Sequence, residues 1–443
     1  MKTSKFKMTE IGEIPADWDT STIASFATVE TGNRNTQDKC ASGLYPFYVR
    51  SPIVERIDDY GYDTEGVITV GDGVGTGKVF HYVNGKFALH QRCYLISNFR
   101  EDIWPRYFYT IFSTRFFDRV MQMTAKSSVD SVRREMITGM EIPIPPLAEQ
   151  KAIAEALSDV DALIAAQEEL IEKKRAIKQG AMQELLTGKK RLPGFGGKCR
   201  QEGLETEDFN AYPLSEASPR SGCPSRGEAQ RCRGSECKMT EVGLIPMDWE
   251  VKRLGEVCNV YDGTHQTPHY VDNGIQFYSV ENVTANDFTN VKYISEEEHI
   301  ALSKRIKVER GDVLMTRIGS IGVCRYINWE VEASYYVSLA LLKKKYDAQI
   351  DMCFLAHLSE SELFKKEVML RSLQFAIPMK INLGKISEIR LCLPPLAEQK
   401  AIAEVLSDMD AEISELEAQK AKFESIKQGM MQELLTGKTR LEV

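Results

Sequence analysis

The chain has 443 residues, of which 43% are hydrophobic and 27% are charged, so it is long enough for two or three domains with full cores. No apolar run approaches the roughly 18 residues that a membrane-spanning helix needs, and the N-terminus lacks the apolar core of a signal peptide, so we expect a cytoplasmic protein. The net charge of −8 argues against binding nucleic acid by bulk electrostatics. The ten cysteines form no CxxC pair, which indicates neither a zinc ribbon nor a disulfide framework.

Two segments of the chain occur twice. The opening KMTEIGEIPADW, residues 7–18, returns as KMTEVGLIPMDW, residues 238–249, with Trp18 and Trp249 as expected packing anchors. Residues 145–192 return without a gap as residues 394–441, with 33 of the 48 positions identical. The stretches between these segments do not visibly match. Similar ends around dissimilar middles indicate one scaffold that carries two different recognition elements.

The repeated segment predicts a long helix. Residues 147–186 contain no Pro and a single Gly, the preceding Pro-Pro suits a helix start, and LLTGK puts Gly188 where a left-handed C-cap belongs. Its apolar residues recur in steps of three and four, which is typical of a coiled-coil seam. The seam residues are Leu157, Val160, Ile164 and Ile171 in the first copy and Leu406, Met409, Ile413, Leu416 and Phe423 in the second.

Each predicted helix is the obvious partner of the other. A helix of about 40 residues is about 60 Å long, and an apolar stripe of that length cannot remain in water. We expect an antiparallel pair, because repeat symmetry favours a two-fold axis. The alternative is that each helix merely covers its own domain. Gly180 and Gly429, which are equivalent, would mark a close helix approach or a bend.

The segment between the two copies, residues 193–237, is rich in Gly, Pro and Ser and has few large apolar residues. This composition is typical of a flexible linker. It also holds four cysteines, and a zinc site is the alternative to free thiols, although the spacing is irregular. These cysteines are Cys199, Cys223, Cys232 and Cys237.

The segments PPLAEQKAIAEALSD and KQGAMQELLTGKKRL resemble the spacer helix of the specificity subunits of type I restriction–modification systems, and both occur twice here. The resemblance covers the chain except for the linker, which looks like an insertion. It implies an α/β fold with two globular target-recognition domains, an internal pseudo-two-fold repeat and an antiparallel two-helix coiled-coil spacer. The expected parts are residues 1–144 and 238–393 as recognition domains, 145–192 and 394–443 as spacer helices, and 193–237 as linker.

The same resemblance implies a non-catalytic subunit in which each domain reads one half of a bipartite duplex DNA site. Two modification (methyltransferase) subunits and the restriction/translocase subunits would be its partners, and S-adenosylmethionine, ATP and Mg²⁺ would bind those partners. The chain itself shows no HExxH, GxSxG or methyltransferase catalytic motif. The alternatives are a coiled-coil scaffold with two ligand-binding domains that do not act on DNA, and the specificity subunit of a methylation-only system.

The first candidate DNA-reading loop follows each opening. DGTHQTPHY, residues 262–270, is similar to a loop motif common in these recognition domains, and a gapless alignment places residues 31–37 opposite it. Asn and Gln suit adenine, Arg suits guanine, and Thr suits either base edges or the thymine methyl, whereas the alternative is a polar surface turn. The candidates are Asn33, Arg34, Asn35, Thr36, Gln37, Thr264, His265, Gln266 and Thr267.

The second candidate is a Gly-rich run, GDGVGTGKVF at residues 71–80, echoed by RIGSIGVCRY at residues 317–326. Its amides could approach phosphates, whereas the alternative is a hairpin turn between strands. The segments that follow, residues 88–96 and 333–342, each predict a strand that leaves this loop and either faces DNA or lines a sheet edge. The candidates are Lys78, Gln91, Arg92, Arg317 and Ser320.

The third candidate precedes each long helix, at residues 125–137 and 372–386. Its Arg and Ser side chains would hold phosphates and set the register on DNA, and the alternative is ordinary helix surface charge. The candidates are Ser127, Ser128, Arg133, Arg134, Lys380 and Asn382.

Overall fold

The computed structural model describes residues 6–73, 75–123, 131–195, 237–373 and 375–442. It divides into two compact units, Met1–Leu170 with Leu416–Val443 (unit 1) and Ile171–Glu415 (unit 2). Each unit therefore contains one copy of the opening, one of the dissimilar middles and a part of both long helices. The linker cysteines Cys199, Cys223 and Cys232 lie outside the described residues, and Cys237 begins the first strand of unit 2.

Unit 1 is built on a six-stranded sheet of order β4-β9-β7-β8-β5-β6, with two small two-stranded sheets, β1-β2 and β3-β10. Its strands are antiparallel except for the parallel pair β5–β8. The elements are β1 (Phe6–Thr9), β2 (Gly12–Pro15), β3 (Asp19–Thr22), α1 (Ile23–Phe26), β4 (Thr28–Thr31), η1 (Thr36–Asp38), β5 (Tyr45–Tyr48), β6 (Glu55–Ile57), β7 (Tyr62–Val70), β8 (Phe80–Leu89), β9 (Cys93–Ser97), α2 (Pro105–Met123), α3 (Arg134–Thr138) and β10 (Glu141–Ile144).

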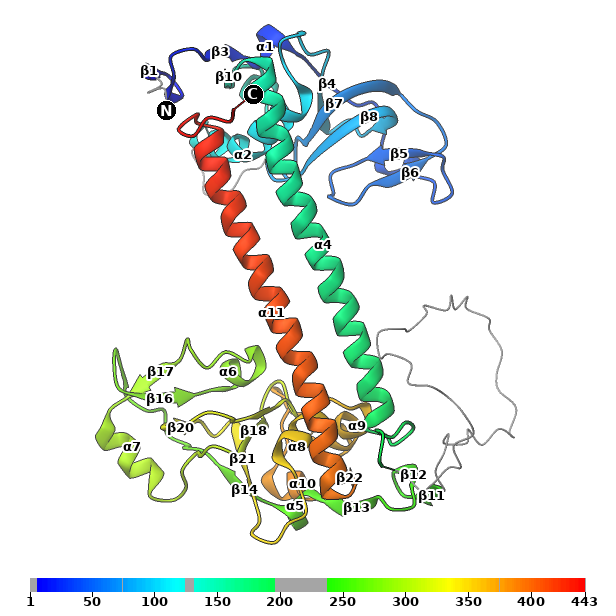
Figure 1. Cartoon of the computed structure of the whole chain (residues 1–443), viewed down its shortest axis with the longest axis vertical. Coiled ribbons are helices and arrows are strands. Elements are labelled where there is room, and N and C mark those ends of the chain that lie inside the picture. The colour runs from blue at the N-terminus through cyan, green and yellow to red at the C-terminus, as the bar shows by residue number, and fades with distance from the viewer. Residues whose placement is uncertain (1–5, 74, 124–130, 196–236, 374, 443) are drawn as a thin grey trace. The chain divides into compact units, whose positions relative to one another are not determined.

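Helix α2 lies against strands β7 and β8 of this sheet (Figure 1). Its Phe108, Phe112 and Phe116 recur every fourth residue, so they share one helix face, and all three are fully buried. Their rings stack with centroids 5.2 and 4.5 Å apart. Burying each such ring contributes roughly 1.5–3 kcal/mol, so this face of α2 is a main source of the unit's stability.

Unit 2 contains two four-stranded sheets, β14-β21-β18-β19 and β15-β17-β16-β20, and two two-stranded sheets, β11-β12 and β13-β22. The pair β16–β20 is parallel. The elements are β11 (Cys237–Thr240), β12 (Gly243–Pro246), β13 (Glu250–Arg253), α5 (Leu254–Val257), β14 (Cys258–Asp262), β15 (Tyr270–Val271), β16 (Ile275–Tyr278), α6 (Val280–Ala285), β17 (Lys292–Ile294), α7 (Glu296–Ser303), β18 (Val313–Thr316), β19 (Cys324–Tyr326), β20 (Ala333–Tyr335), β21 (Leu339–Lys344), α8 (Met352–Leu358), α9 (Glu362–Arg371), α10 (Leu383–Ser387) and β22 (Arg390–Leu393).

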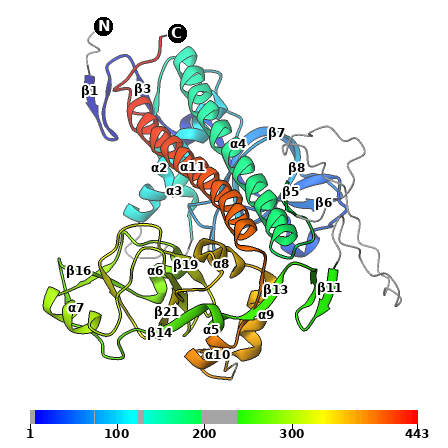
Figure 2. The ribbon, with the colours of Figure 1, turned by 60° about the horizontal axis from the view of Figure 1, so that its bottom comes forward.

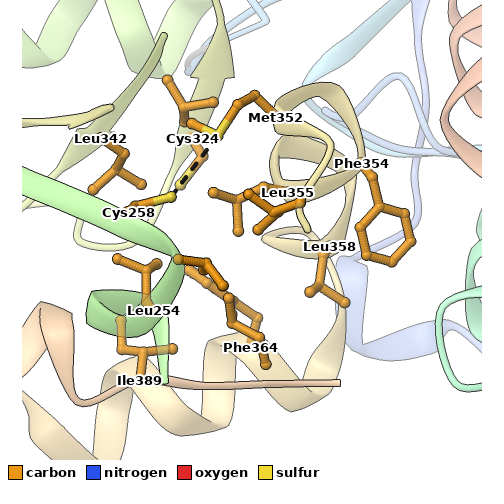
Figure 3. Close-up of a cluster of buried hydrophobic side chains, with 14 of the residues drawn as sticks. Leu254, Cys258, Cys324, Leu342, Met352, Phe354, Leu355, Leu358, Phe364 and Ile389 are labelled. Carbon is orange, nitrogen blue, oxygen red and sulfur yellow. Dashed lines mark hydrogen bonds between the residues drawn. The ribbon is translucent and has the colours of Figure 1, made fainter. Parts of the chain in front are cut away.

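Helices α5 and α10 lie beside strand β14 of unit 2 (Figure 2). The core between these elements is apolar and includes Cys258, whose sulfur lies 3.8 Å from that of Met352 (Figure 3). Burial raises the pKa of the Cys258 thiol to about 12, so it packs as a neutral group and is no nucleophile. The expected mixture of helix and sheet is thus present in both units, mostly as antiparallel sheet.

The two repeated segments form helices of equal length, α4 (Leu147–Leu185) and α11 (Leu396–Leu434). In unit 1, Asp161 and Glu168 of α4 pair with Lys427 and Lys420 of α11 at 2.5 and 2.7 Å. In unit 2, Lys174 and Lys178 of α4 pair with Glu412 and Asp410 at 2.6 and 2.7 Å. Within each unit the partner in α11 moves back along the chain as α4 advances, so the two stretches run antiparallel.

The ends of both helices are part of the domain cores. Ile153 and Leu157 of α4 are buried in the core of unit 1 together with Leu434 at the end of α11 and Leu435 just after it. The end of α4 is buried in the core of unit 2 beside Ile402 and Leu406 of α11. Among the seam residues, Leu157, Ile171, Leu406 and Ile413 are buried, and Val160, Ile164, Met409, Leu416 and Phe423 are half-buried. Each long helix therefore packs into the core of unit 1 near one end and into the core of unit 2 near the other. The alternative that each helix covers only its own domain is wrong.

An ion-pair cluster fixes the end of α11 in unit 1, and we call it the unit 1 clasp: Asp17, Trp18, Glu149 and Arg440. Arg440 donates to Asp17 at 2.9 Å and to Glu149, and its guanidinium lies 5.7 Å from the Trp18 ring centroid. The indole N–H of the fully buried Trp18 donates to Glu149 at 3.1 Å. The expectation that the opening tryptophan is a packing anchor is confirmed.

The unit 2 clasp repeats this cluster with Asp248, Trp249, Glu398 and Arg191. Arg191 donates to Asp248 at 2.8 and 2.9 Å and to Glu398, and its guanidinium lies 5.8 Å from the Trp249 ring centroid. Trp249 donates to Glu398 at 3.2 Å. Because Arg191 follows α4 and Arg440 follows α11, the end of each long helix is held by the opening and the helix start of the other copy.

The glycine after each long helix is required by both conformation and space. Gly188 and Gly437 have φ of +68°, and a Cβ there would meet Pro246 at 2.6 Å and Pro15 at 2.4 Å respectively. The predicted left-handed C-cap at Gly188 is therefore confirmed. A Cβ at Gly180 or Gly429 would meet nothing within 4 Å, so the expected close helix approach at those positions is wrong.

Candidate nucleic-acid interface

Each unit brings the first candidate loop against a three-residue turn between two strands. In unit 1 the turn His90–Arg92 joins β8 to β9, and Arg34 forms a parallel bridge with His90. In unit 2 the turn after β20 leads into β21, and Thr264 forms a parallel bridge with Tyr336. The expectation of one continuous strand over residues 88–96 and over 333–342 is wrong, because both segments break at this turn.

A glycine allows this close approach in both units. A Cβ on Gly32 would lie 2.1 Å from the carbonyl oxygen of Leu89, and a Cβ on Gly263 would lie 2.2 Å from that of Tyr335. Both contacts are far too short for any side chain. The gapless alignment of residues 31–37 with the second loop therefore pairs two glycines, Gly32 and Gly263, that allow the same close backbone approach.

The Gly-rich run connects antiparallel strands in both units, β7 to β8 and β18 to β19, so the hairpin interpretation is confirmed. Its start is tied to the turn described above: the Gly71 N–H donates to the Arg92 carbonyl at 2.8 Å, and the Arg317 N–H donates to the Ser338 carbonyl at 2.9 Å. Lys78 lies elsewhere, over the Phe117 ring of α2. Phosphate binding by this run stays a prediction.

The third candidate loop packs against the start of the Gly-rich run. In unit 1, the Val132 N–H donates to the Gly71 carbonyl at 2.7 Å. In unit 2, the Gly319 N–H donates to the Met379 carbonyl at 2.8 Å and the Ile381 N–H donates to the Arg317 carbonyl at 2.9 Å. Four segments, namely the first loop, the start of the Gly-rich run, the turn between the two strands and the third loop, therefore form one surface in each unit. We call it the reading surface: residues 31–37, 71–73, 90–92 and 131–134 in unit 1, and 262–267, 317–320, 336–338 and 379–382 in unit 2.

Most of the predicted site residues present their side chains to solvent. Arg34, Thr264 and Arg317 are half-buried, and Ser127 and Ser128 lie outside the described residues. Arg133 and Asn382 are the N-cap residues of α3 and α10. The exposed ones are Asn33, Asn35, Thr36, Gln37, Lys78, Gln91, Arg92, Arg133, Arg134, His265, Gln266, Thr267, Ser320, Lys380 and Asn382.

Side-chain bonds fix several candidate residues of unit 1. The Gln91 amide donates to the Asn35 side-chain oxygen at 2.6 Å, and Arg34 pairs with Asp59 at 2.5 Å. The Nδ1 of buried His90 accepts a hydrogen bond from the Arg92 amide at 3.0 Å. Burial and the neighbouring Arg50 lower the pKa of His90, so its ring is neutral and orients the turn.

Each reading surface also contains a carboxylate that pairs with two side chains. Asp72 pairs with Arg50 at 3.2 Å and with Arg92 at 3.0 Å. Asp262 pairs with His265 and with Arg305, each at 2.9 Å. Burial opposes the charge of Asp262, yet its pKa is lowered because the His265 hydrogen bond and the Arg305 charge outweigh that effect.

Sequence reasoning missed Arg50 and Arg305. Both lie outside the candidate segments and reach the surface only through tertiary contacts, and no motif marks them.

Within the described ranges no group of three or more His, Cys, Asp or Glu side chains could hold a metal ion. In the same part of the chain, no helix is long and apolar enough to cross a membrane.

The chain is similar to known proteins over most of its length. Residues 15–174 and 246–424 match the family described as type I restriction modification DNA specificity domain. The type I restriction enzyme MjaVIII specificity subunit of Methanocaldococcus jannaschii is 25% identical over all of this chain and 97% of its own length. The type I restriction enzyme EcoDI specificity subunit of Escherichia coli is 23% identical over 92% of this chain and 84% of its own length.

A solved structure shares the fold. The crystal structure of the S subunit of a type I restriction–modification system from M. genitalium superposes with a TM-score of 0.60 at 14% identity, covering all of both chains. The family match covers well over half of the chain and includes the last residues of both openings, both middles and most of both helices. The chain therefore belongs to the type I restriction–modification DNA specificity family and is a non-catalytic subunit that recognises DNA sequence.

Proposed function

We propose that this specificity subunit reads a bipartite duplex site, with the reading surface of unit 1 on one half and that of unit 2 on the other. The observation that carries the proposal is that the same four segments converge in both units through equivalent backbone bonds, while their side chains differ. Side chains that project from equivalent backbone positions would meet DNA in equivalent ways but select different bases.

The antiparallel stretches of α4 and α11 support a coiled-coil spacer with pseudo-two-fold symmetry between the two recognition domains. The two clasps support it further, because each uses the opening of one copy and the helix end of the other. A rigid spacer would hold the half-sites at a fixed distance, and about one helical turn of DNA, about 34 Å, would let both domains use one face.

We place the methyltransferase subunits on the repeated scaffold, one for each copy, because repeated surfaces bind like partners. S-adenosylmethionine would bind these partners, and ATP and Mg²⁺ the restriction/translocase subunits. The near-neutral recognition segments agree with such a complex: residues 1–144 carry 17 basic and 18 acidic side chains, so tight binding needs partners that complete the DNA channel.

The test is a genome-wide map of N6-methyladenine in cells that express this chain with the methyltransferase subunit of its own restriction–modification system. Cells with the methyltransferase alone are the control. The proposal expects a split, asymmetric motif that appears only when the chain is present. No new motif, despite a soluble complex of the two proteins, would contradict it. Methylation in a system that lacks a restriction subunit would instead identify a methylation-only system.

A further inference from the structure

The carboxylate of Asp72 sits between two cations at the centre of the unit 1 reading surface. Its side chain is 20% exposed, whereas those of Arg50 and Arg92 are 47% and 62% exposed. The carboxylate is therefore the fixed member of the cluster, and the two guanidinium groups reach outward from it. Asp72 also forms a β-bridge with Ser131, which places it where the Gly-rich run meets the third loop.

Unit 2 reaches the same arrangement from another position. Asp262 is 12% exposed, whereas His265 and Arg305 are 69% and 65% exposed. The carbonyl of Asp262 accepts a hydrogen bond from the Tyr335 hydroxyl at 3.2 Å, which fixes the residue at the end of β14. Asp72 belongs to the Gly-rich run and Asp262 to the first loop. The two dissimilar middles thus each place a carboxylate on the reading surface, but from different positions in the chain.

Stability does not explain these clusters. An ion pair whose basic partner is largely exposed to water contributes only about 1 kcal/mol or less, and a carboxylate beside DNA is repelled by the phosphates. A G·C base pair, however, satisfies both ions in the major groove. Arginine donates bidentately to guanine O6 and N7, and a carboxylate accepts from the cytosine N4 amino group. On any other base pair, or on a phosphate, the arginine leaves its carboxylate with one partner fewer and with no cytosine amino group in its place.

We propose that Asp72 and Asp262 determine specificity for a G·C pair, each in the half-site that its own unit reads, by competing with DNA for the cations beside them. Arg50 or Arg92 in unit 1 and Arg305 in unit 2 donate to the guanine, and the carboxylates position them. Non-cognate DNA is rejected because taking the cation leaves the carboxylate facing the DNA backbone. This inference rests on the proposed bipartite reading of DNA.

The test compares Asp72→Asn with the wild type in the complex with the methyltransferase. Binding is measured over a salt series to a duplex with the mapped motif and to one with both half-sites scrambled. The substitution frees a cation for phosphate, so binding to the scrambled duplex becomes tighter and its log–log salt slope steeper by about 0.9. The preference for the mapped motif falls on the order of tenfold, and replacing the critical G·C pair of the first half-site no longer weakens binding.

Asp262→Asn serves as the second variant and should lower the sequence preference at the second half-site only. The matched control is Asp102→Asn, which removes a carboxylate from another exposed pair, with Arg100, beyond the far end of β9 from the reading surface. An equal loss on both duplexes, or no difference from the control, would overturn the inference while leaving the proposed function intact. A wild-type complex that fails to prefer the mapped motif would overturn the proposed function and this inference with it.

Discussion

The two clasps use the same four residue types at nearly the same distances, whereas the two reading surfaces place different side chains on the same backbone bonds. Arg440 and Arg191 each join an aspartate and a glutamate and cover a buried tryptophan. In contrast, Asn35 and Gln91 face each other in unit 1, where unit 2 has other residues. The side chains of the scaffold are therefore constrained by their own packing, whereas the reading surfaces are constrained only in their backbone geometry.

The largest expected effect is on the unfolding free energy, and it distinguishes a buried position of the long helices from an exposed one. Leu406→Asp places a charge in the core of unit 2, where the leucine is fully buried. We expect a loss of more than about 4 kcal/mol of unfolding free energy. Leu163→Asp on α4, where the leucine is 52% exposed, should change it by less than about 1 kcal/mol. Urea denaturation of the purified chain checks this, and equal effects of the two substitutions would refute the described packing.

The clasp arginine ranks next. Arg191→Ala leaves the fully buried carboxylate of Glu398 without its charged partner, and such losses cost about 3–5 kcal/mol. Arg310→Ala removes an arginine from an exposed pair with Glu330 and should cost less than about 1 kcal/mol. If thermal melting gave the same shift for both, the clasp would not be a stabilising element.

A further comparison uses two glycines of the same repeat, Gly437 and Gly429, for which opposite changes in stability are expected. Gly437→Ala forces a side chain into a left-handed conformation against Pro15 and should destabilise unit 1 by about 2 kcal/mol or more. Gly429→Ala lies in the helix with open space around it and should stabilise by about 0.5–1 kcal/mol. The two changes in melting temperature should therefore have opposite signs, and a common sign would contradict the role assigned to the helix end.

Substitutions on the reading surface should leave stability unchanged and alter recognition. Thr264→Ala with Gln266→Ala removes two side chains of the first loop of unit 2, and discrimination at the second half-site should fall by about 1–3 kcal/mol. The melting temperature should stay that of the wild type, because loop residues of this kind rarely contribute more than about 0.5 kcal/mol. Mapped methylation with an unaltered second half-site would remove this loop from the reading surface.

The smallest effect is a pH dependence of the clasps. Hydrogen bonds from Arg440 and Arg191 hold the pKa of Asp17 and of Asp248 below the ordinary value of 3.8. The stability that these carboxylates add is therefore complete above that pH and is lost as the pH falls below it. Because both are partly exposed, the change is less than about 1 kcal/mol for each.

Asp248→Asn should remove its share of this dependence, seen as a smaller difference in denaturation midpoint between pH 5 and pH 3. The exposed Asp408→Asn variant of α11 should keep the wild-type dependence. A variant at Asp248 that follows the wild type over this range would show that the ion pair contributes nothing.

Much of the scaffold was predictable because it is repeated. The identity of the two copies located the helices, the apolar steps indicated their pairing, and LLTGK indicated the C-cap at Gly188. The partner of each helix end was not predictable. Arg191 and Arg440 carry no local signal for the aspartate and glutamate that they join across up to 423 positions of the chain.

The candidate site was predictable as segments but not as a surface. Three stretches rich in polar residues, Gly or Arg were identified, and the structure brings them together through backbone bonds that no sequence pattern encodes. The turn at residues 90–92 is not evident from the sequence, because the apolar residues on both sides of it favour one continuous strand. Arg50 and Arg305 were missed because their contacts with Asp72 and Asp262 join distant loops.

The most direct test of modular reading is to exchange residues 19–144 for the corresponding domain of another specificity subunit and map methylation again. The frame, with both clasps and both helices, stays unchanged in this chimera. The account predicts a motif with a new first half, the same second half and the same spacing. A motif in which both halves change would contradict the assignment of one half-site to each unit.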